Sequence, residues 1–287
     1  MNTLSGPLPG RTATLPREAC LPINRCNLPA AIVGSLAFQQ APVALELDGV
    51  RALHRDLFAK LDAAPAPTRR AEIFQDYVTV QFRLEHLDEA GLTARAGRHG
   101  NRGKANYIRM IRGWSFNADS REGAVLKAWV ESRFGLVPRH HVESLRDHSS
   151  AAWLRYLEMR AKGLYGSNAL ESQLDLVYTY CQYEFARQTP QTTHLTLYRG
   201  VNRYGDFERL PDFPPRLPDG SEVLLLNNLN SLTGTRDRAD EFGDIILTMQ
   251  VPVAKILFHC RLLPGILKGE DEYLAIGGVY AARSATF

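Results

Sequence analysis

Hydrophobic residues recur every three or four positions through most of the first two thirds of the chain, which is the period of an amphipathic helix. This period predicts helices over residues 48–63, 68–87, 105–115, 121–135, 149–163 and 168–188. We expect the apolar stripes to form helix packing faces in the core. The stripe of the second helix consists of Ile73, Tyr77, Val80 and Leu84. The stripe of the last helix consists of Leu170, Leu174, Val177, Cys181 and Phe185.

After Pro190 the hydrophobic period changes to two, which is typical of half-buried strands. One short helix interrupts these strands, with Thr235 as its N-cap and with Ala239 and Phe242 facing inward. A helical first part followed by a strand-rich second part predicts the α+β class. The expected strands cover residues 194–201, 222–229, 245–251, 256–260 and 273–280.

The first 45 residues contain six prolines, which favour extended segments and turns over helices. We therefore divide the chain into an N-terminal strap (1–45), a helical region (46–190) and a β-rich core (191–287) that together form one compact domain. With 287 residues, of which 45% are hydrophobic, the chain can bury a large core, so we expect a soluble globular protein.

The net charge of +3 is too small for a dedicated nucleic-acid binder and fits a single anionic ligand or an acidic protein patch better. The four cysteines match neither a zinc ribbon nor a disulfide framework, which favours the reducing cytoplasm. No export signal is evident, and the apolar run over residues 28–38 is too short to cross a membrane.

One arginine is predicted to face the core. Leu195, Leu197 and Arg199 share one face of a strand, and a buried guanidinium is unfavourable unless an anion meets it. An ordinary ion pair is the alternative for an isolated arginine.

The next strand is apolar at its start and carries Ser231 and Thr233 at its end, on the same face. By itself, such a serine is usually a turn or cap residue.

Two carboxylates lie two residues apart near the end of the chain. Glu270 and Glu272 align with the apolar residues that follow them, whereas Asp271 faces the other way. Neighbouring carboxylates repel each other, which raises the pKa of one of them and suits proton transfer. A solvated acidic turn after Gly269 is the alternative. The conjunction of arginine, hydroxyl and carboxylate on consecutive strands favours a functional site.

Three motifs carry a family resemblance: Leu-Tyr-Arg-Gly at 197–200, Asn-Leu-Asn-Ser-Leu-Thr at 228–233 and Gly-Glu-Asp-Glu-Tyr-Leu at 269–274. They resemble the arginine-serine-glutamate class of mono-ADP-ribosyltransferases over about residues 194–280. The helical region, including residues 101–104, is similar to the bacterial dinitrogenase reductase ADP-ribosyltransferases. The resemblance implies an ADP-ribosyltransferase fold, in which the helical half packs on a β-sandwich-like catalytic core with an NAD+ cleft.

The same resemblance implies the roles of the site residues. Arg199 and the adjacent Gly200 would bind the NAD+ phosphates, and Ser231 would shape the nicotinamide side of the pocket. Glu272 would be the catalytic carboxylate, and Glu270 would give specificity for an acceptor arginine. The family more often has Ser-Thr-Ser where this chain has Ser231-Leu232-Thr233, so a second hydroxyl is retained on Thr233 while the middle hydroxyl is replaced by leucine. Further binding residues would include Asn228 and Thr233, with Phe242 or Tyr204 stacking on nicotinamide.

The implied activity is transfer of ADP-ribose from NAD+ to an arginine, with the nitrogenase iron protein as target and a PII-type signalling protein as regulator. The alternatives are a non-catalytic NAD+-binding or protein-binding module and an NAD+ glycohydrolase.

The basic segment 91–104 lacks the spacing of a phosphate loop, so a solvated loop is expected, with docking of an acidic partner or NAD+ phosphate as the alternative. The pair His140-His141 has no companion at metal-ligand spacing, so we expect no metal site.

Overall fold

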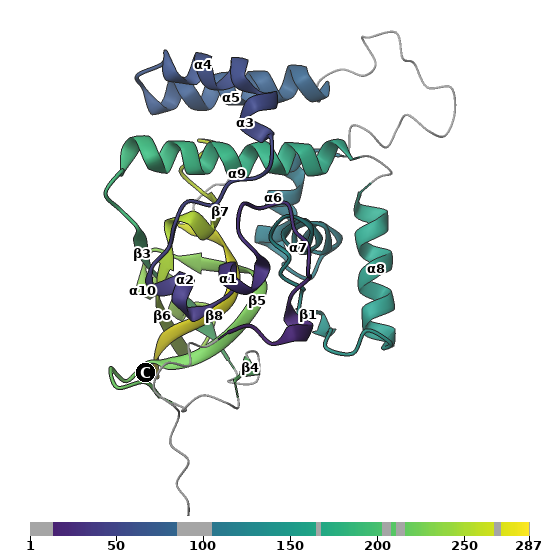
Figure 1. Cartoon of the computed structure of the whole chain (residues 1–287), viewed down its shortest axis with the longest axis vertical. Helices are drawn as coiled ribbons and strands as arrows, with labels where there is room; N and C mark the ends of the chain where they lie inside the picture. Colours follow the sequence, from purple (N-terminus) through teal and green to yellow (C-terminus); the bar gives the residue numbers. More distant parts are fainter. Residues whose placement is uncertain are drawn as a thin grey trace, which may run out of the picture.

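The computed structural model describes residues 14–84, 105–164, 168–202, 208–210, 216–266 and 271–286. Helix α9 (Ala169–Gln188) lies between the strand-rich body and the helices α4 (Arg55–Asp62) and α5 (Pro67–Phe82), as Figure 1 shows. Helix α7 (Arg121–Phe134) flanks the strands on another side and carries α8 (Ala151–Gly163) on its outer face. Within the described residues, no helix is long and apolar enough to cross a membrane.

Every helix predicted from the period of three to four is present, with shifted ends. The first divides into α3 (Val50–Leu53) and α4, because His54 leaves the helical conformation between them. The next, α5, ends early at Phe82, where Arg83 adopts a left-handed conformation with φ of 52°.

The predicted packing stripe is confirmed for α9 and only in part for α5, where Ile73, Tyr77 and Leu84 pack half-buried against the core. Four of the five α9 stripe residues are fully buried. In α5, Val80 is 77% exposed, whereas Phe74 and Val78 are fully buried. The α5 face is rotated because Arg70 turns inward and forms a buried bidentate pair with Glu184 of α9, at 2.6 and 2.8 Å. A charged residue thus belongs to the packing face, which an apolar stripe cannot indicate.

Residues 14–49 run over the strand-rich body with little regular structure beyond the short helices α1 (Ala30–Val33) and α2 (Leu36–Gln40). The amide of Gln39 hydrogen bonds to the backbone of Gln250 and Ala281 on two different strands. The carbonyl of Gly34 accepts from Val279 N at 2.8 Å. This segment is therefore fixed to the sheet by side-chain and backbone contacts.

The strands expected after Pro190 form an antiparallel six-stranded sheet among the described residues. Four of them close into a ring, because β5 pairs with β3, β3 with β6, β6 with β8, and β8 again with β5. A small separate hairpin consists of β1 (His140–His141) and β2 (Glu143–Ser144). The six strands are β3 (His194–Val201), β4 (Glu208–Arg209), β5 (Glu222–Thr233), β6 (Ile245–Pro252), β7 (Ile256–His259) and β8 (Glu272–Thr286).

Strands β5 and β8 are longer than predicted, and their pairing is irregular near its middle. The register of β5 shifts between Leu226 and Leu229, and β8 contains Gly277 and Gly278 opposite this shift. A Cβ atom on Gly277 would lie only 1.7 Å from the carbonyl oxygen of Asn227. Beyond this register shift the two strands pair regularly until Thr233 lies opposite Glu272. The ends of β5 and β8 therefore carry their polar residues to the same place.

Candidate active site

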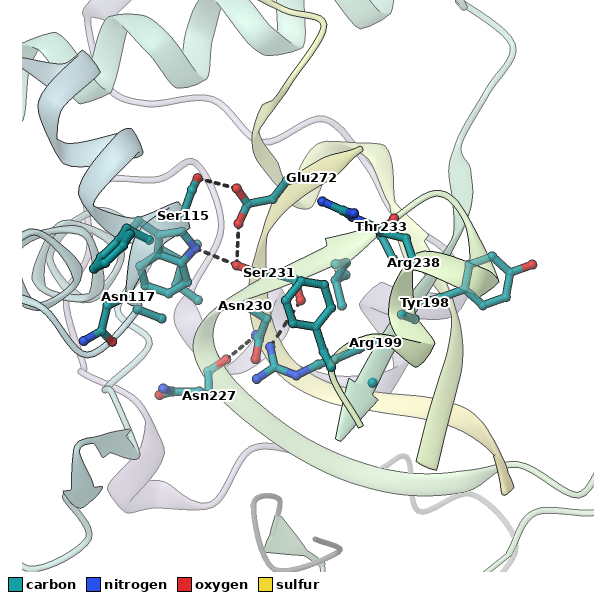
Figure 2. Close-up of a pocket in the computed structure, with 18 of the residues that line it drawn as sticks. Ser115, Asn117, Tyr198, Arg199, Asn227, Asn230, Ser231, Thr233, Arg238 and Glu272 are labelled. Atoms are coloured by element: carbon teal, nitrogen blue, oxygen red, sulfur yellow. Dashed lines mark hydrogen bonds between the residues drawn. The ribbon is translucent and has the colours of Figure 1, made fainter. Parts of the chain in front are cut away.

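A cavity of about 470 Å³ opens where β3, β5 and the start of β8 meet the C-terminal end of helix α6 (Tyr107–Phe116). The short helix α10 (Arg236–Asp240) forms another wall. Figure 2 shows the labelled polar side chains converging on this cavity from both the helical region and the strands. Of the predicted site residues, Arg199, Gly200, Ser231, Thr233, Phe242 and Glu272 line the cavity.

Glu272 and Ser231 form the centre of the site. The Ser231 hydroxyl donates to Glu272 Oε1 at 2.6 Å, as the dashed line in Figure 2 marks. The two residues come from neighbouring strands, two positions apart in the β5–β8 register, in which Thr233 lies opposite Glu272. Glu272 is only 7% exposed, so its carboxylate sits in a largely dehydrated environment where electrostatic effects are strong.

Helix α6 supplies two more donors to this pair. The indole Nε1 of Trp114 donates to Ser231 Oγ at 2.7 Å. The Ser115 hydroxyl hydrogen bonds to Glu272 Oε2, so both carboxylate oxygens accept a hydroxyl. Neither residue was predicted as part of the site. Trp114 lies on the apolar face of a predicted helix, where a core role is the ordinary interpretation. An indole, unlike a phenyl ring, brings a polar group into such a face, and this was the available signal.

Arg199 lies beside the same pair, as predicted from strand parity. Its Nη1 donates to the backbone carbonyl of Ser231 at 3.3 Å. Gly200 also lines the cavity, and its absence of a side chain has a packing reason: a Cβ atom there would lie 1.9 Å from the carbonyl oxygen of Ala239. Glycine at this position allows α10 to approach β3.

Asn228 is a correction to the predicted binding residues. Its side chain is 2% exposed and donates to the carbonyl oxygens of Lys127 and Leu136, at 2.7 and 2.9 Å, so it fixes α7 to β5. The asparagines that line the cavity are instead Asn117, Asn227 and Asn230.

Two other expectations differ from the structure. Asp271, predicted to face away, lines the cavity next to Glu272 and pairs with Arg261 at 3.4 Å. Phe242, predicted to face inward, is 62% exposed and stands at the cavity wall. Glu270, Tyr204 and the basic segment 91–104 lie outside the described residues.

A buried cation adjoins the cavity on the α7 side. Lys127 is 2% exposed, and its Nζ lies 2.8 Å from Asp119 Oδ1 and 3.2 Å from His141 Nδ1. Burial lowers the pKa of Lys127, and burial together with the nearby Lys127 lowers the pKa of His141 to about 4. His141 is therefore neutral at neutral pH and accepts from the lysine. A lysine inside the apolar run Ala-Val-Leu-Lys-Ala-Trp-Val was the sequence signal for this cluster.

The arrangement combines three cationic side chains, those of Lys127, Arg199 and Arg238, with the carboxylates of Asp119, Asp271 and Glu272 around one cavity. Arg199 and Lys127 suit an anionic ligand such as a diphosphate. Glu272 is placed to stabilise a positive charge that develops near it. In the described part of the chain, no cluster of three or more His, Cys, Asp or Glu side chains could hold a metal ion.

Comparison with known proteins agrees with this chemistry. The chain is 39% identical over 266 residues, which are 91% of this chain and 94% of the relative, to the NAD(+)--dinitrogen-reductase ADP-D-ribosyltransferase of Rhodospirillum rubrum. No solved structure matches the chain significantly. The family model "Dinitrogenase reductase ADP-ribosyltransferase (DRAT)" matches residues 23–284. The chain therefore belongs to the dinitrogenase reductase ADP-ribosyltransferase family.

Proposed function

We propose that this enzyme transfers ADP-ribose from NAD+ to an arginine of dinitrogenase reductase, the iron protein of nitrogenase, and so inactivates it reversibly. The observation that carries the proposal is the meeting of Arg199, Ser231 and Glu272 at one cavity. Membership of the family and the name of the Rhodospirillum rubrum relative support the substrate and the target. The antiparallel strand ring with helices packed against it is consistent with an ADP-ribosyltransferase fold.

In this proposal Arg199 holds the NAD+ diphosphate and Glu272 lies beneath the ribose. The bond between the ribose C1′ and the nicotinamide nitrogen breaks, and its electron pair leaves with nicotinamide. Glu272 stabilises the oxocarbenium-like sugar that remains, and such preorganised electrostatics are commonly the largest catalytic contribution. A guanidinium nitrogen of the target then forms the new bond to C1′ and loses a proton.

The proton needs an acceptor, because a guanidinium with a pKa above 12 is a poor nucleophile. The family resemblance assigns this role to Glu270. Asp271 lines the cavity next to Glu272 and provides a second carboxylate against which Glu270 can be compared. General-base assistance of this kind is worth roughly 100-fold to 10,000-fold.

The test is incubation of the chain with labelled NAD+ and dinitrogenase reductase, followed by mass spectrometry of the target. Label on an arginine supports the proposal. Glu272→Gln is expected to abolish transfer and NAD+ hydrolysis with little loss of NAD+ affinity. Glu270→Gln is expected to stop transfer and spare slow hydrolysis, whereas Asp271→Asn should leave both.

Two outcomes contradict the proposal and match the alternatives. Nicotinamide release that is independent of any acceptor protein would identify an NAD+ glycohydrolase. NAD+ binding without turnover would identify a non-catalytic module. Equal loss of hydrolysis and transfer in Glu270→Gln would contradict the division of roles between Glu270 and Glu272.

The proposal also includes the setting of the reaction. The family resemblance suggests a PII-type signalling protein as regulator, which binding measurements with purified PII protein would test. A cytoplasmic location is consistent with the four cysteines, all of which are free thiols in the structure.

A further inference from the structure

The geometry points to Trp114 and Ser115 of helix α6 as positioning residues that hold Ser231 and Glu272 in their reactive arrangement. This inference rests on the proposed role of Glu272 in cleaving NAD+. It assigns part of the catalytic apparatus to the helical region, which lies outside the three motifs of the strand-rich part. We call Trp114 and Ser115 the α6 clamp.

The direction of the hydrogen bonds determines what Trp114 does. An indole N–H only donates, so Ser231 Oγ must accept from Trp114 at 2.7 Å. A hydroxyl carries one proton, and with the indole on one side Ser231 directs that proton to Glu272 Oε1 at 2.6 Å. Trp114 thus orders a relay of donors that ends on the carboxylate.

Ser115 fixes the second carboxylate oxygen. Its hydroxyl is within reach of two acceptors, the carbonyl oxygen of Ile111 at 3.1 Å and Glu272 Oε2. A charged acceptor forms the stronger hydrogen bond, so an ionised Glu272 takes the single proton. With Ser231 on Oε1 and Ser115 on Oε2, the plane of the carboxylate is fixed from two sides, as Figure 2 shows for these labelled residues.

Helix α6 is itself rigidly mounted, as a clamp requires. At its N-terminal end, the Gln173 side chain of α9 accepts from Tyr107 N and donates to the carbonyl of Ala105, both at 2.9 Å. At its other end, Arg112 Nε donates to the carbonyl of Ile266 at 2.9 Å. Trp114 is only 2% exposed, so packing fixes the indole before any ligand enters.

Glu272 depends on such support because of its place in the chain. It is the first residue of β8, where its backbone pairs with Thr233 and accepts from Cys260 N at 3.0 Å. These contacts fix the backbone but leave the side-chain torsions open. The α6 clamp restrains the side chain through both carboxylate oxygens, and a displacement of a reactive group by about 1 Å can cost about 100-fold in rate.

The test uses Ser115→Ala and Trp114→Phe in the full-length enzyme, with NAD+ hydrolysis and transfer to dinitrogenase reductase as separate assays. We expect kcat to fall about 10-fold to 100-fold in Ser115→Ala, the loss typical of one hydrogen bond to a charged group, and about 2-fold to 10-fold in Trp114→Phe, whose bond goes to a neutral hydroxyl, while KM for NAD+ changes little in both. In Ser115→Ala the acid limb of the kcat/KM profile should move to higher pH, because the carboxylate loses a donor. Ser115→Thr restores a hydroxyl and should recover most of the activity.

Matched controls separate positioning from folding. Ser172→Ala removes a serine of α9 whose hydroxyl reaches the carbonyl four residues back, as Ser115 does, but far from the cavity. Trp153→Phe removes an indole that stacks on His148. Both control variants should keep wild-type kcat and pH profile. Thermal unfolding of every variant shows whether it is folded.

The inference is overturned if folded Ser115→Ala and Trp114→Phe keep wild-type kcat and pH profile, which would make both residues packing elements only. It is also overturned if Ser115→Thr is no better than Ser115→Ala. A wild-type enzyme that hydrolyses NAD+ but leaves dinitrogenase reductase unmodified would contradict the proposed target alone, because hydrolysis still measures the clamp. A wild-type enzyme that consumes no NAD+ in either assay overturns both.

Discussion

The Ser231 hydroxyl accepts a hydrogen bond from Trp114 of helix α6 and donates one to Glu272 of strand β8. Its backbone carbonyl accepts from Arg199. Three chain segments thus meet at one residue. A substitution at any of the three partners changes the surroundings of the others, so single-residue effects here are expected to be non-additive.

Arg199→Ala should mainly weaken NAD+ binding, because it removes the guanidinium that faces the cavity beside Ser231. We expect the Kd for NAD+ to rise about 10-fold to 100-fold, as for the loss of a hydrogen bond to a charged group. Isothermal titration calorimetry measures this directly. The matched control is Arg155→Ala, which removes an exposed arginine that pairs with Glu143. An unchanged Kd in Arg199→Ala would contradict the proposed phosphate contact.

At the scale of single residues, strand parity and the order of the motifs were enough to predict which residues meet. Arg199, Ser231 and Glu272 meet as expected. Asn228 was placed in the site by the family resemblance, but its buried amide bonds to Lys127 and Leu136, and such contacts between distant segments leave no mark in the local pattern. Trp114 and Lys127 were missed because each lies within a helix whose apolar neighbours account for the pattern.

At the scale of elements, the register shift between β5 and β8 determines where the proposed catalytic residues lie. Gly277 allows the two strands to approach at the register shift, and the register beyond it places Thr233 opposite Glu272. The site therefore depends on a backbone contact some way along the same two strands.

Gly277→Ala should destabilise the fold, because its Cβ would lie 1.7 Å from the Asn227 carbonyl oxygen, which is backbone and cannot rotate away. We expect a loss of about 3 kcal/mol or more in the free energy of unfolding, at the upper end of overpacking effects. Urea denaturation measures it. The control is Gly49→Ala, where the backbone has φ of 72° but a Cβ atom would meet nothing within 4 Å, so only about 1–2 kcal/mol of backbone strain is expected. Equal losses in the two variants would show that the β5–β8 contact at Gly277 tolerates a side chain.

The element boundaries show how far the periodicity carries. The predicted helix at 105–115 and the one at 121–135 agree closely with α6 and α7. Strand β8 continues to Thr286, six residues beyond its predicted end, through alternating small and polar residues whose hydrophobic pattern is weak. Pairing with β6 fixes this last part, and pairing between distant segments is not encoded locally.

At the scale of the whole molecule, Lys255 joins the N-terminal segment to the strand ring. It is fully buried, its Nζ donates to the carbonyl of Gly277 at 2.9 Å, and it lies over the rings of Phe38 and Tyr280 at 5.5 and 4.7 Å. Burial lowers the pKa of Lys255 to about 7.

This shift makes stability depend on pH with a defined sign. The folded protein releases the Lys255 proton near pH 7 and the unfolded chain near its ordinary pKa of 10.5, so between these values the unfolded chain binds more protons. The free energy of unfolding should therefore rise from pH 7 to pH 9, by up to about 1.4 kcal/mol per pH unit. Lys255→Met should be the more stable protein at pH 7 and should lose this rise.

Urea denaturation at pH 7, 8 and 9 measures the effect. Lys162→Met, which removes an exposed lysine paired with Glu158, should keep the wild-type slope. If Lys255→Met and the wild type show parallel pH dependences, the aromatic rings keep Lys255 charged throughout this range.

The division into a helical part and a strand-rich part was predictable at this scale, because the change of period after Pro190 is clear in the sequence. The closure of four strands into a ring was not, because it follows from pairings between residues 33 to 60 positions apart. The contribution of the helical region to the cavity likewise depends on how the two parts dock.

The bond between Trp114 and Ser231 gives the enzyme an internal optical reporter. Of its three tryptophans, Trp129 donates to Asp175 and Trp153 stacks on His148, whereas Trp114 is bonded to Ser231 in the proposed active site. Indole emission responds to the polarity around it, so arrival of a dinucleotide should change the fluorescence of this one ring. Occupancy of the cavity can then be followed in real time without a label, and Trp114→Phe supplies the blank.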